Sequence, residues 1–371
     1  MKSKDILVGV KASQLSIGSQ VPYPVYNKSG RLLFAKNKTL VNDSQRLHLL
    51  RDGLFLIEFP DSEDSVQSLV SHLKIHLSNA FELLETQSHE PFIRCIYQLA
   101  LDIQHHCAQT PDAVLGAAHS DYDSEYWLIH PIHCAVMCEI VASSISMPVP
   151  DKLSLLCAAL TQNISFYQEQ QSLHTKDAGL SDEEEERVRT HPMRSYQMLI
   201  EAGVNDNFWL DAVRNHHERI DGSGYPFHLK EFLVSPPSKI IAIADIYAAA
   251  TRSRAYREEL LSRDAMQEIF NERGKSVCEH LTKSFVAQIS IYPPGTYVKL
   301  VNKEIGIVKV RGEEISKPEV GIIIDAKGAF YDKFQLRLTS EPEYAIAQVL
   351  PFSQFTQLEP WLPLLWPTIE I

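Results

Sequence analysis

The pattern of apolar residues divides the chain into a helical middle and two ends that are rich in short strands. From residue 65 to about residue 288, apolar residues recur with a helical period, for example at Val66, Leu69 and Leu73. Further helical segments are predicted over residues 126–146, 151–166, 238–251 and 263–289. An acidic run that follows Ser181 is interpreted as a helix start, where the helix dipole favours negative charge.

Both ends of the chain alternate short apolar runs with turns. Near the N-terminus, residues 21–26 and 31–34 flank a turn as a hairpin, and a helix over 44–50 and a strand over 54–57 follow. Beyond residue 291, strands are predicted over 297–301, 305–310 and 320–324. The chain is therefore expected to be mainly α, a helical bundle flanked by two small β-rich domains and thus α+β as a whole. The expected regions are 1–62 (β-rich), 63–115 (helical connector), 116–290 (helical domain) and 291–371 (β-rich).

Composition and charge narrow the class of protein. The 371 residues carry a net charge of −12, with 44% hydrophobic and 22% charged residues, as in ordinary globular proteins. An acidic surface repels phosphate backbones, so a nucleic-acid polymer is not an expected partner, whereas a local arginine cluster could still hold a small anion. No signal peptide and no run of about 20 apolar residues is found, so no membrane span is expected.

The six cysteines form no CxxC pair and lie mostly in apolar helical patterns, which is typical of reduced, buried thiols in a cytoplasmic protein. Cys134 and Cys138 lie one helical turn apart. They are interpreted as core residues, and a metal or redox role is the less favoured alternative.

One run of eleven residues carries most of the chemical information. His216 and His217 end a helical segment and are followed at once by Glu218 and the turn Asp221-Gly222-Ser223-Gly224-Tyr225-Pro226. Adjacent imidazoles at a helix end are suited to metal binding. The run resembles the HHE…DGSGYP signature of the HD-GYP family, metal-dependent phosphodiesterases that hydrolyse the bacterial second messenger cyclic di-GMP. The resemblance extends over about residues 116 to 290 and implies an HD-type helical bundle for that region.

The resemblance also implies a set of metal ligands from distant helices. His130, His191, His216, His217 and Asp245 each match a ligand position of the family, in family-like order. The neighbouring His133 is interpreted as structural. In the family these ligands hold two or more divalent ions, which lower the pKa of a bridging water and neutralise charge in the transition state.

The chain departs from the family where the HD superfamily takes its name. The segment 158–166 aligns with the AALLHDIGK motif, but Gln162 replaces the ligand histidine, Asn163 the bridging aspartate and Phe166 the phosphate-contacting lysine. A neutral amide bridges two cations poorly, and phenylalanine cannot neutralise a phosphate. We therefore expect no metal or a single Fe, Mn or Zn ion, held by the three imidazoles of His191, His216 and His217. Asp121 and Asp123 are weaker candidates for replacing the missing carboxylate.

The ligand side of the cleft is better retained. Residues 251–257 resemble the family segment that clamps the phosphates of the dinucleotide, and this assigns Arg254 and Arg257 as phosphate ligands. An exposed basic helix end is the alternative interpretation. Gly222, Gly224, Tyr225 and Pro226 would shape the mouth of the cleft, and in the family this loop is also linked to the docking of cyclase partners.

The leading hypothesis is a pseudoenzyme of bacterial signalling: a catalytically impaired, cytoplasmic cyclic di-GMP receptor or signalling adaptor. One alternative is a residual phosphodiesterase that uses one metal ion. Another is a scaffold that binds neither metal nor nucleotide and contacts proteins through the Gly-Tyr-Pro loop and the helix near residues 65–85. That helix could serve as a connector or as the seam of a homodimer.

Overall fold

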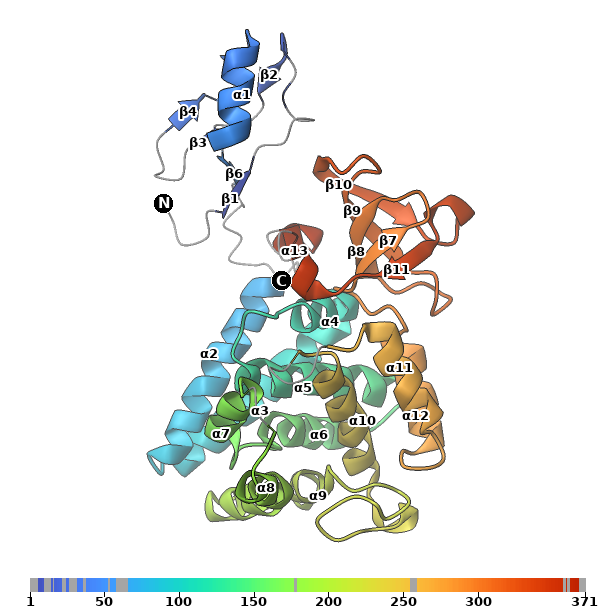
Figure 1. Cartoon of the computed structure of the whole chain (residues 1–371). Coiled ribbons are helices and arrows are strands. Elements are labelled where there is room, and N and C mark those ends of the chain that lie inside the picture. Colours follow the sequence, from blue (N-terminus) through green and yellow to red (C-terminus); the bar gives the residue numbers. More distant parts are fainter. Residues whose placement is uncertain are drawn as a thin grey trace.

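The computed structural model in Figure 1 has a helical centre and two β-containing ends. It describes residues 6–9, 15, 17–21, 25–26, 32–35, 38–52, 54–57, 66–176, 179–253, 259–355, 358 and 361–366. The expected mainly α class with a β-rich C-terminal part is confirmed.

The N-terminal part combines an antiparallel sheet with one helix. The sheet has the order β1-β6-β3-β4 and is formed by β1 (Ile6–Gly9), β6 (Leu54–Ile57), β3 (Val25–Tyr26) and β4 (Leu32–Phe34). A second pair consists of β2 (Gln20–Val21) and β5 (Lys38–Thr39), and α1 (Asp43–Asp52) packs with a small separate core. The pairing of β3 with β4 confirms the hairpin, whose turn lies outside the described residues.

The middle of the chain is a bundle of helices around one hydrophobic core. Its long helices are α2 (Val66–Glu85), α3 (His89–Gln109), α5 (Tyr126–Ser144), α6 (Val149–Thr161), α8 (Asp182–Glu201) and α10 (Pro236–Ala250). Shorter ones are α4 (Pro111–His119), α7 (Tyr167–His174), α9 (Asn207–Asn215), α11 (Ser262–Asn271), α12 (Glu279–Ile289) and the 3₁₀ turn η2 (Glu231–Leu233).

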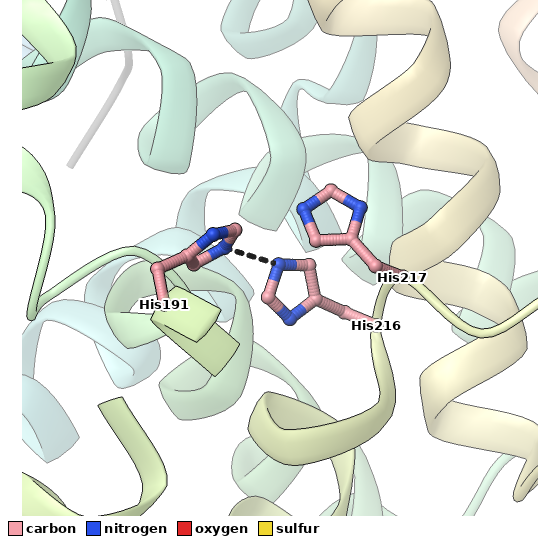
Figure 2. Close-up of side chains that lie close together, drawn as sticks. All are labelled: His191, His216 and His217. Carbon is pink, nitrogen blue, oxygen red and sulfur yellow. Dashed lines mark hydrogen bonds between the residues drawn. The ribbon is translucent and has the colours of Figure 1, made fainter. Parts of the chain in front are cut away.

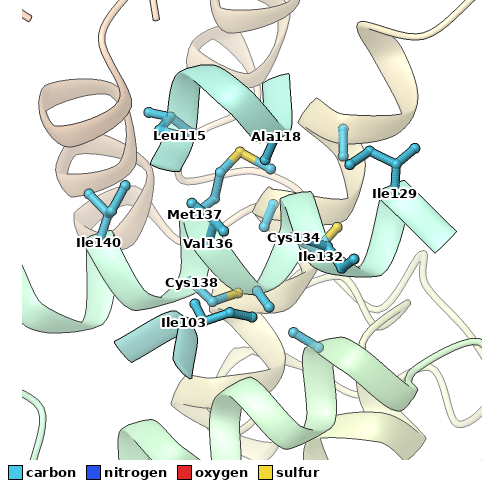
Figure 3. Packing of buried hydrophobic residues seen from close by; sticks show 14 of the residues in the cluster. Ile103, Leu115, Ala118, Ile129, Ile132, Cys134, Val136, Met137, Cys138 and Ile140 are labelled. Carbon is cyan, nitrogen blue, oxygen red and sulfur yellow. The ribbon is translucent and has the colours of Figure 1, made fainter. Parts of the chain in front are cut away.

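Helix α5 is the centre of this bundle. Figure 3 shows its apolar side chains in contact with residues of α3 and α4, among them Ile103 and Leu115. By length and composition alone α5 could cross a membrane, but 78% of its most apolar window is buried inside the fold. It is therefore built as the core helix of a packed domain.

The predicted connector over residues 63–115 differs from what the structure contains. Helices α2 and α3 contribute Leu73, Leu77 and Ile96 to the same core as α5, and the expected boundary at residue 115 falls inside α4. These helices therefore pack as part of the bundle, since their apolar faces are covered by it. Prediction by helical period alone could not separate a covered face from a free one.

Two long helices of the sequence prediction are interrupted. The segment 151–166 is helical only to Thr161, because turn hydrogen bonds from Ile164 N to Thr161 O and from Phe166 N to Asn163 O replace the helical ladder. The segment 263–289 is divided into α11 and α12 by a turn that contains Gly274 at φ +72°. The first interruption carries Asn163 and Phe166 into the functional cavity.

The C-terminal part is a five-stranded antiparallel sheet of order β10-β9-β8-β7-β11. Its strands are β7 (Tyr297–Leu300), β8 (Ile305–Val310), β9 (Glu319–Ile324), β10 (Phe330–Leu338) and β11 (Ile346–Val349). Short turns η3 (Pro342–Tyr344) and η4 (Phe352–Gln354) and helix α13 (Leu362–Leu365) complete it. The first three strands were predicted; β10 and β11 were not.

The tail after α13 joins the sheet to the bundle. The Trp366 ring lies so close to Gly116 that a Cβ atom at this glycine would overlap it, and the indole Nε1 donates to the carbonyl of Lys309 at 3.0 Å. The apolar tail therefore packs against helix α4 of the bundle and is bonded to strand β8 of the sheet.

Candidate metal centre and ligand cavity

Two well-capped helices position the three histidines of the first cluster. Helix α8 begins with a capping box between Ser181 and Glu184, which confirms that the acidic run is a helix start, and it carries His191. Helix α9 is capped by Asp206 and ends at Asn215, so His216 and His217 lie at its C-terminal boundary. We call His191, His216 and His217 the histidine cluster; Figure 2 shows their rings gathered together.

The ring nitrogens of this cluster have defined roles. His191 Nδ1 lies 2.6 Å from the carbonyl oxygen of Val188, and His216 Nδ1 lies 2.7 Å from that of Val213. A carbonyl oxygen only accepts, so both rings carry their proton on Nδ1 and present the lone pair of Nε2. These two Nε2 atoms face each other at 3.2 Å, the contact drawn as a dashed line in Figure 2.

Two facing lone pairs at this distance repel unless a positive charge or a proton lies between them. Burial and the neighbouring His216 lower the pKa of His191 to about 3. Burial lowers the pKa of His216 to about 4. Neither ring is therefore protonated near neutral pH. A tetrahedral ion with metal–nitrogen bonds of about 2.0–2.1 Å holds two nitrogens about 3.3 Å apart. The histidine cluster therefore fits a divalent metal ion.

A second group of donors lies across the cavity. His130 and Cys134 are one turn apart on α5, and Asp245 is on α10; their ligand atoms lie within 4.8 Å of one another. We call these three residues the mixed cluster. His130 Nε2 is 2.9 Å from Asp245 Oδ1, and Asp245 Oδ2 is 3.9 Å from His217 Nδ1. Burial alone would raise the pKa of Asp245, but the hydrogen bond from His130 and the nearby His217 hold it below its usual range.

The residues at the positions where the resemblance implies a His-Asp dyad lie around these two clusters. Asn163 lines the cavity together with His130, His191 and Asp245. Phe166 stacks on the ring of His191 with a centroid distance of 5.5 Å. Gln162 is fully buried, and neither polar atom of its side chain has a hydrogen-bond partner among the described residues. The amide and the phenyl ring thus line the cavity at positions where the resemblance implies a carboxylate and a cation.

The cavity in front of the two clusters has a volume of about 260 Å³. Its remaining walls come mainly from α5, from α7 and its flanking turns, and from the loop after α9, with Tyr126, Phe166, His174 and Tyr225 among them. The predicted phosphate ligands Arg254 and Arg257 lie outside the described residues. The nearby Arg252 is buried and donates to the backbone carbonyls of Ala118, His119 and Asp121, so it holds the fold together.

The Gly-Tyr-Pro loop is held in place by a buried carboxylate. Glu218 accepts hydrogen bonds from the backbone N–H groups of Phe227 at 2.6 Å and Leu229 at 2.8 Å. A Cβ atom at Gly224 would overlap the backbone of residues 217–219, so only glycine fits there. The Tyr225 ring then stacks on His217 with a centroid distance of 4.7 Å. The loop therefore packs against the histidine cluster and lines the cavity with it.

Three other residues that the sequence analysis considered lie outside the two clusters. Asp121 forms an ion pair with Lys74 at 2.5 Å, and both Asp121 and Asp123 line a different cavity, so neither replaces Asn163. His133 is buried beside His119 and Tyr247, and the structural interpretation of this histidine fits its position.

Two residues of this region have neighbours that were not predicted. The assignment of Cys134 to the core is confirmed, and its spacing of four residues from His130 also places both residues on one helix face. Glu218 was quoted within the motif without a role, although a carboxylate before a Gly/Pro turn is a suitable acceptor for the N–H groups of the turn. The positions of both were readable in the sequence, but their partners were not.

Comparison with known proteins agrees with this geometry. A family model described as an HD domain matches residues 107–277. The chain is 27% identical over 218 residues to "Cyclic di-GMP phosphodiesterase PA4108" of Pseudomonas aeruginosa, covering 58% of this chain and 52% of that protein. It is 25% identical over 211 residues to "Cyclic di-GMP phosphodiesterase PdeB" of Borreliella burgdorferi, with 57% and 55% covered. The chain thus spans about half the length of these curated relatives.

Two further matches refine the comparison. A "3'3'-cGAMP-specific phosphodiesterase 1" of Vibrio cholerae is 29% identical over 154 residues, covering 42% of this chain and 36% of that protein. Among solved structures, Bd1817 of Bdellovibrio bacteriovorus, described as an HDGYP protein, matches with a TM-score of 0.52 and 14% identity over 76% of this chain and 98% of its own. Residues 107–277 therefore match the HD domain family model, and this part of the chain is similar to curated cyclic di-GMP phosphodiesterases, with the fold of a protein described as HDGYP.

Proposed function

We propose that this protein is a catalytically impaired receptor or signalling adaptor for cyclic di-GMP. The observation that carries the proposal is the position of Asn163, which lines the cavity beside ligands of both clusters with an amide in place of a carboxylate. Names of the relatives support the ligand class, since these proteins act on cyclic di-GMP or on 3′3′-cGAMP.

Loss of the carboxylate bears directly on hydrolysis. When bound, a pair of metal ions supplies an activated water and neutralises charge on the phosphoryl group. Holding two ions together requires a negative oxygen between them, and the Asn163 amide oxygen is neutral. Phe166 covers the ring of His191 where a cation would face the phosphate. The same residues still leave a cavity with ordered imidazoles, which suits binding without turnover.

Signalling to a protein partner would use the loop that borders the cavity. Residues of this loop and of η2 expose apolar side chains: Phe227 is 45% exposed and Phe232 is 84% exposed. Because the loop packs on His217 through Tyr225, occupancy of the cavity and the shape of this surface are physically linked. A diguanylate cyclase is the partner that the family resemblance suggests.

Isothermal titration calorimetry of the full chain with cyclic di-GMP tests the proposal, with 3′3′-cGAMP as the comparison ligand. We expect binding at micromolar protein, either alone or after addition of Mn²⁺, and no consumption of the dinucleotide. Absence of heat with and without metal, together with an unchanged melting temperature, would instead favour the scaffold that binds neither ligand.

A residual phosphodiesterase that uses one metal ion is the second candidate. The facing Nε2 atoms of His191 and His216 favour it, since they fit one ion without help from Asn163. A hydrolysis assay with Mn²⁺ or Fe²⁺ distinguishes the two functions. Turnover that disappears in His216→Ala would establish the enzyme and remove the impaired receptor.

A further inference from the structure

We propose that Cys134 adds a thiolate to the ligand positions His130 and Asp245, so that the mixed cluster takes a zinc-like divalent ion. His130 and Asp245 are ligand positions that the family resemblance already implies. The new element is the sulfur donor, in a region where the family pattern supplies oxygen and nitrogen donors only. The inference does not depend on nucleotide binding or on turnover.

Distances in the mixed cluster are close to those that one ion requires. Cys134 Sγ lies 3.8 Å from His130 Nε2, and His130 Nε2 lies 2.9 Å from Asp245 Oδ1. A tetrahedral ion with a metal–sulfur bond of about 2.3 Å and metal–nitrogen or metal–oxygen bonds of about 2.0–2.1 Å holds these pairs about 3.5 and 3.3 Å apart. Shifts of a few tenths of an ångström therefore convert the hydrogen-bonded group into a metal site.

The surroundings of the thiol point to a ligand as well. Gln162, which is fully buried on the adjoining helix end, has two polar side-chain atoms without a hydrogen-bond partner among the described residues. The Gln162 amide lies beside the Cys134 thiol, and a buried amide without a partner is costly. A metal ion held by Cys134 could take the Gln162 oxygen as a further donor.

Access and charge are consistent with this site. His130 and Asp245 line the cavity, so an ion can reach them from outside, and Cys134 lies buried directly beside them. Binding would transfer the thiol proton to solvent and form a sulfur–metal bond, so that one thiolate and one carboxylate balance the two charges of the ion. Sulfur donors favour Zn²⁺ and Co²⁺ over Mg²⁺ and Mn²⁺.

Cys138 provides a matched control within the same helix. It lies one turn beyond Cys134 on α5, where Figure 3 labels both residues, and the side chains of both are buried. Cys138 belongs to neither candidate metal group among the described residues. If both cysteines serve only as core residues, substituting either one should affect metal binding equally. If Cys134 is a ligand, only its substitution should reduce metal binding.

Cobalt titration of the full-length protein tests the proposal by absorption spectroscopy, because a thiolate–Co²⁺ bond gives a charge-transfer band in the near ultraviolet. We expect this band in the wild-type protein and in Cys138→Ser. It should also persist in His216→Ala, which disrupts the other cluster. The band should be lost in Cys134→Ser, together with one equivalent of bound metal.

Absence of the band in the wild-type protein, or its persistence in Cys134→Ser, overturns the proposal. Should Cys134→Ser fail to fold, X-ray absorption at the zinc edge of the loaded wild-type protein decides instead. A sulfur neighbour at about 2.3 Å supports the site, and a shell of nitrogen and oxygen alone refutes it.

Discussion

The two donor clusters of the cavity differ in how well they are prepared for a metal ion. In the histidine cluster, backbone carbonyls of Val188 and Val213 fix the Nδ1 protons of two rings and leave both Nε2 atoms free. In the mixed cluster, His130 Nε2 is bound to Asp245, and His130 Nδ1 has no partner among the described residues. The histidine cluster is thus preorganised for a metal ion, whereas in the mixed cluster the Asp245 carboxylate is already paired with His130.

This difference has a simple physical meaning. Outer partners that orient a ligating imidazole typically contribute about 10–100-fold in metal affinity, and only the histidine cluster has them. An ion at the mixed cluster must first displace the hydrogen bond between His130 and Asp245. We therefore expect the histidine cluster to fill first and the mixed cluster to fill at higher metal concentration. With Asn163 neutral, no carboxylate at this position links the two sites, and Asp245 of the mixed cluster lies 3.9 Å from His217 of the other.

The largest expected effect comes from restoring the bridge between the clusters. The triple variant Gln162→His, Asn163→Asp, Phe166→Lys places a carboxylate beside both clusters and a cation near His191. Hydrolysis of cyclic di-GMP with Mn²⁺ should rise by at least about a thousandfold, or about 4 kcal/mol of barrier. When His216→Ala is added to the triple variant, the rate of hydrolysis should fall back to that of the parent protein. Full metal loading without any gain in rate would show that Asn163 is not the deficit.

Removal of one imidazole should break the preorganised cluster alone. In His216→Ala we expect metal affinity at this cluster to fall by at least about 100-fold, since a direct ligand is lost. Competition titration with a chromophoric chelator measures the change. The exposed His105→Ala is the control and should bind as the parent does. Equal losses at both clusters would mean that the two sites are coupled.

A smaller effect is expected from the carboxylate that holds the loop. In Glu218→Gln one of the two acceptor oxygens becomes a donor, so one charge-assisted bond to Phe227 N or Leu229 N is lost. Urea unfolding should show a destabilisation of about 1.5–3 kcal/mol. The exposed Glu231→Gln should leave the unfolding free energy unchanged. The loop contacts His217 through Tyr225. The metal affinity of the histidine cluster should therefore fall as well, whereas that of the mixed cluster should not change.

The smallest effect concerns a buried histidine that belongs to neither cluster. Burial lowers the pKa of His119 to about 3, well below the value of about 6.5 in an unfolded chain. The folded protein thus keeps this ring neutral while the unfolded chain takes up a proton, so stability falls as the pH drops below about 6.5. Between about pH 7 and pH 5.5 the contribution is about 1 kcal/mol.

Urea unfolding of the metal-free protein and of His119→Gln at these two pH values checks this expectation. The variant should lose less stability on acidification than the parent. An identical loss in both proteins would show that other groups dominate. The difference between the two proteins in their loss of unfolding free energy is the contribution of His119, which lies outside both clusters.

Local signals allowed much of this architecture to be predicted. Apolar periods located the helices, the capping residue Ser181 located the start of α8, and the eleven-residue run located His216, His217 and the loop. The prediction failed at the interruption after Thr161, because the period alone does not reveal which turn bonds replace a helical ladder. It also left the helices before residue 116 outside the bundle that covers them.

By itself, the sequence determined which side chains are available for chemistry: the imidazoles, the Asp245 carboxylate and the neutral substitutes at 162, 163 and 166. Only the tertiary structure decided which of them meet. His130 and Asp245 are 115 residues apart and come into contact because α5 and α10 pack together. Cys134 acquires its place beside them in the same way. Residue type is fixed locally by the chain, whereas the neighbours of a buried donor are fixed by packing between distant helices.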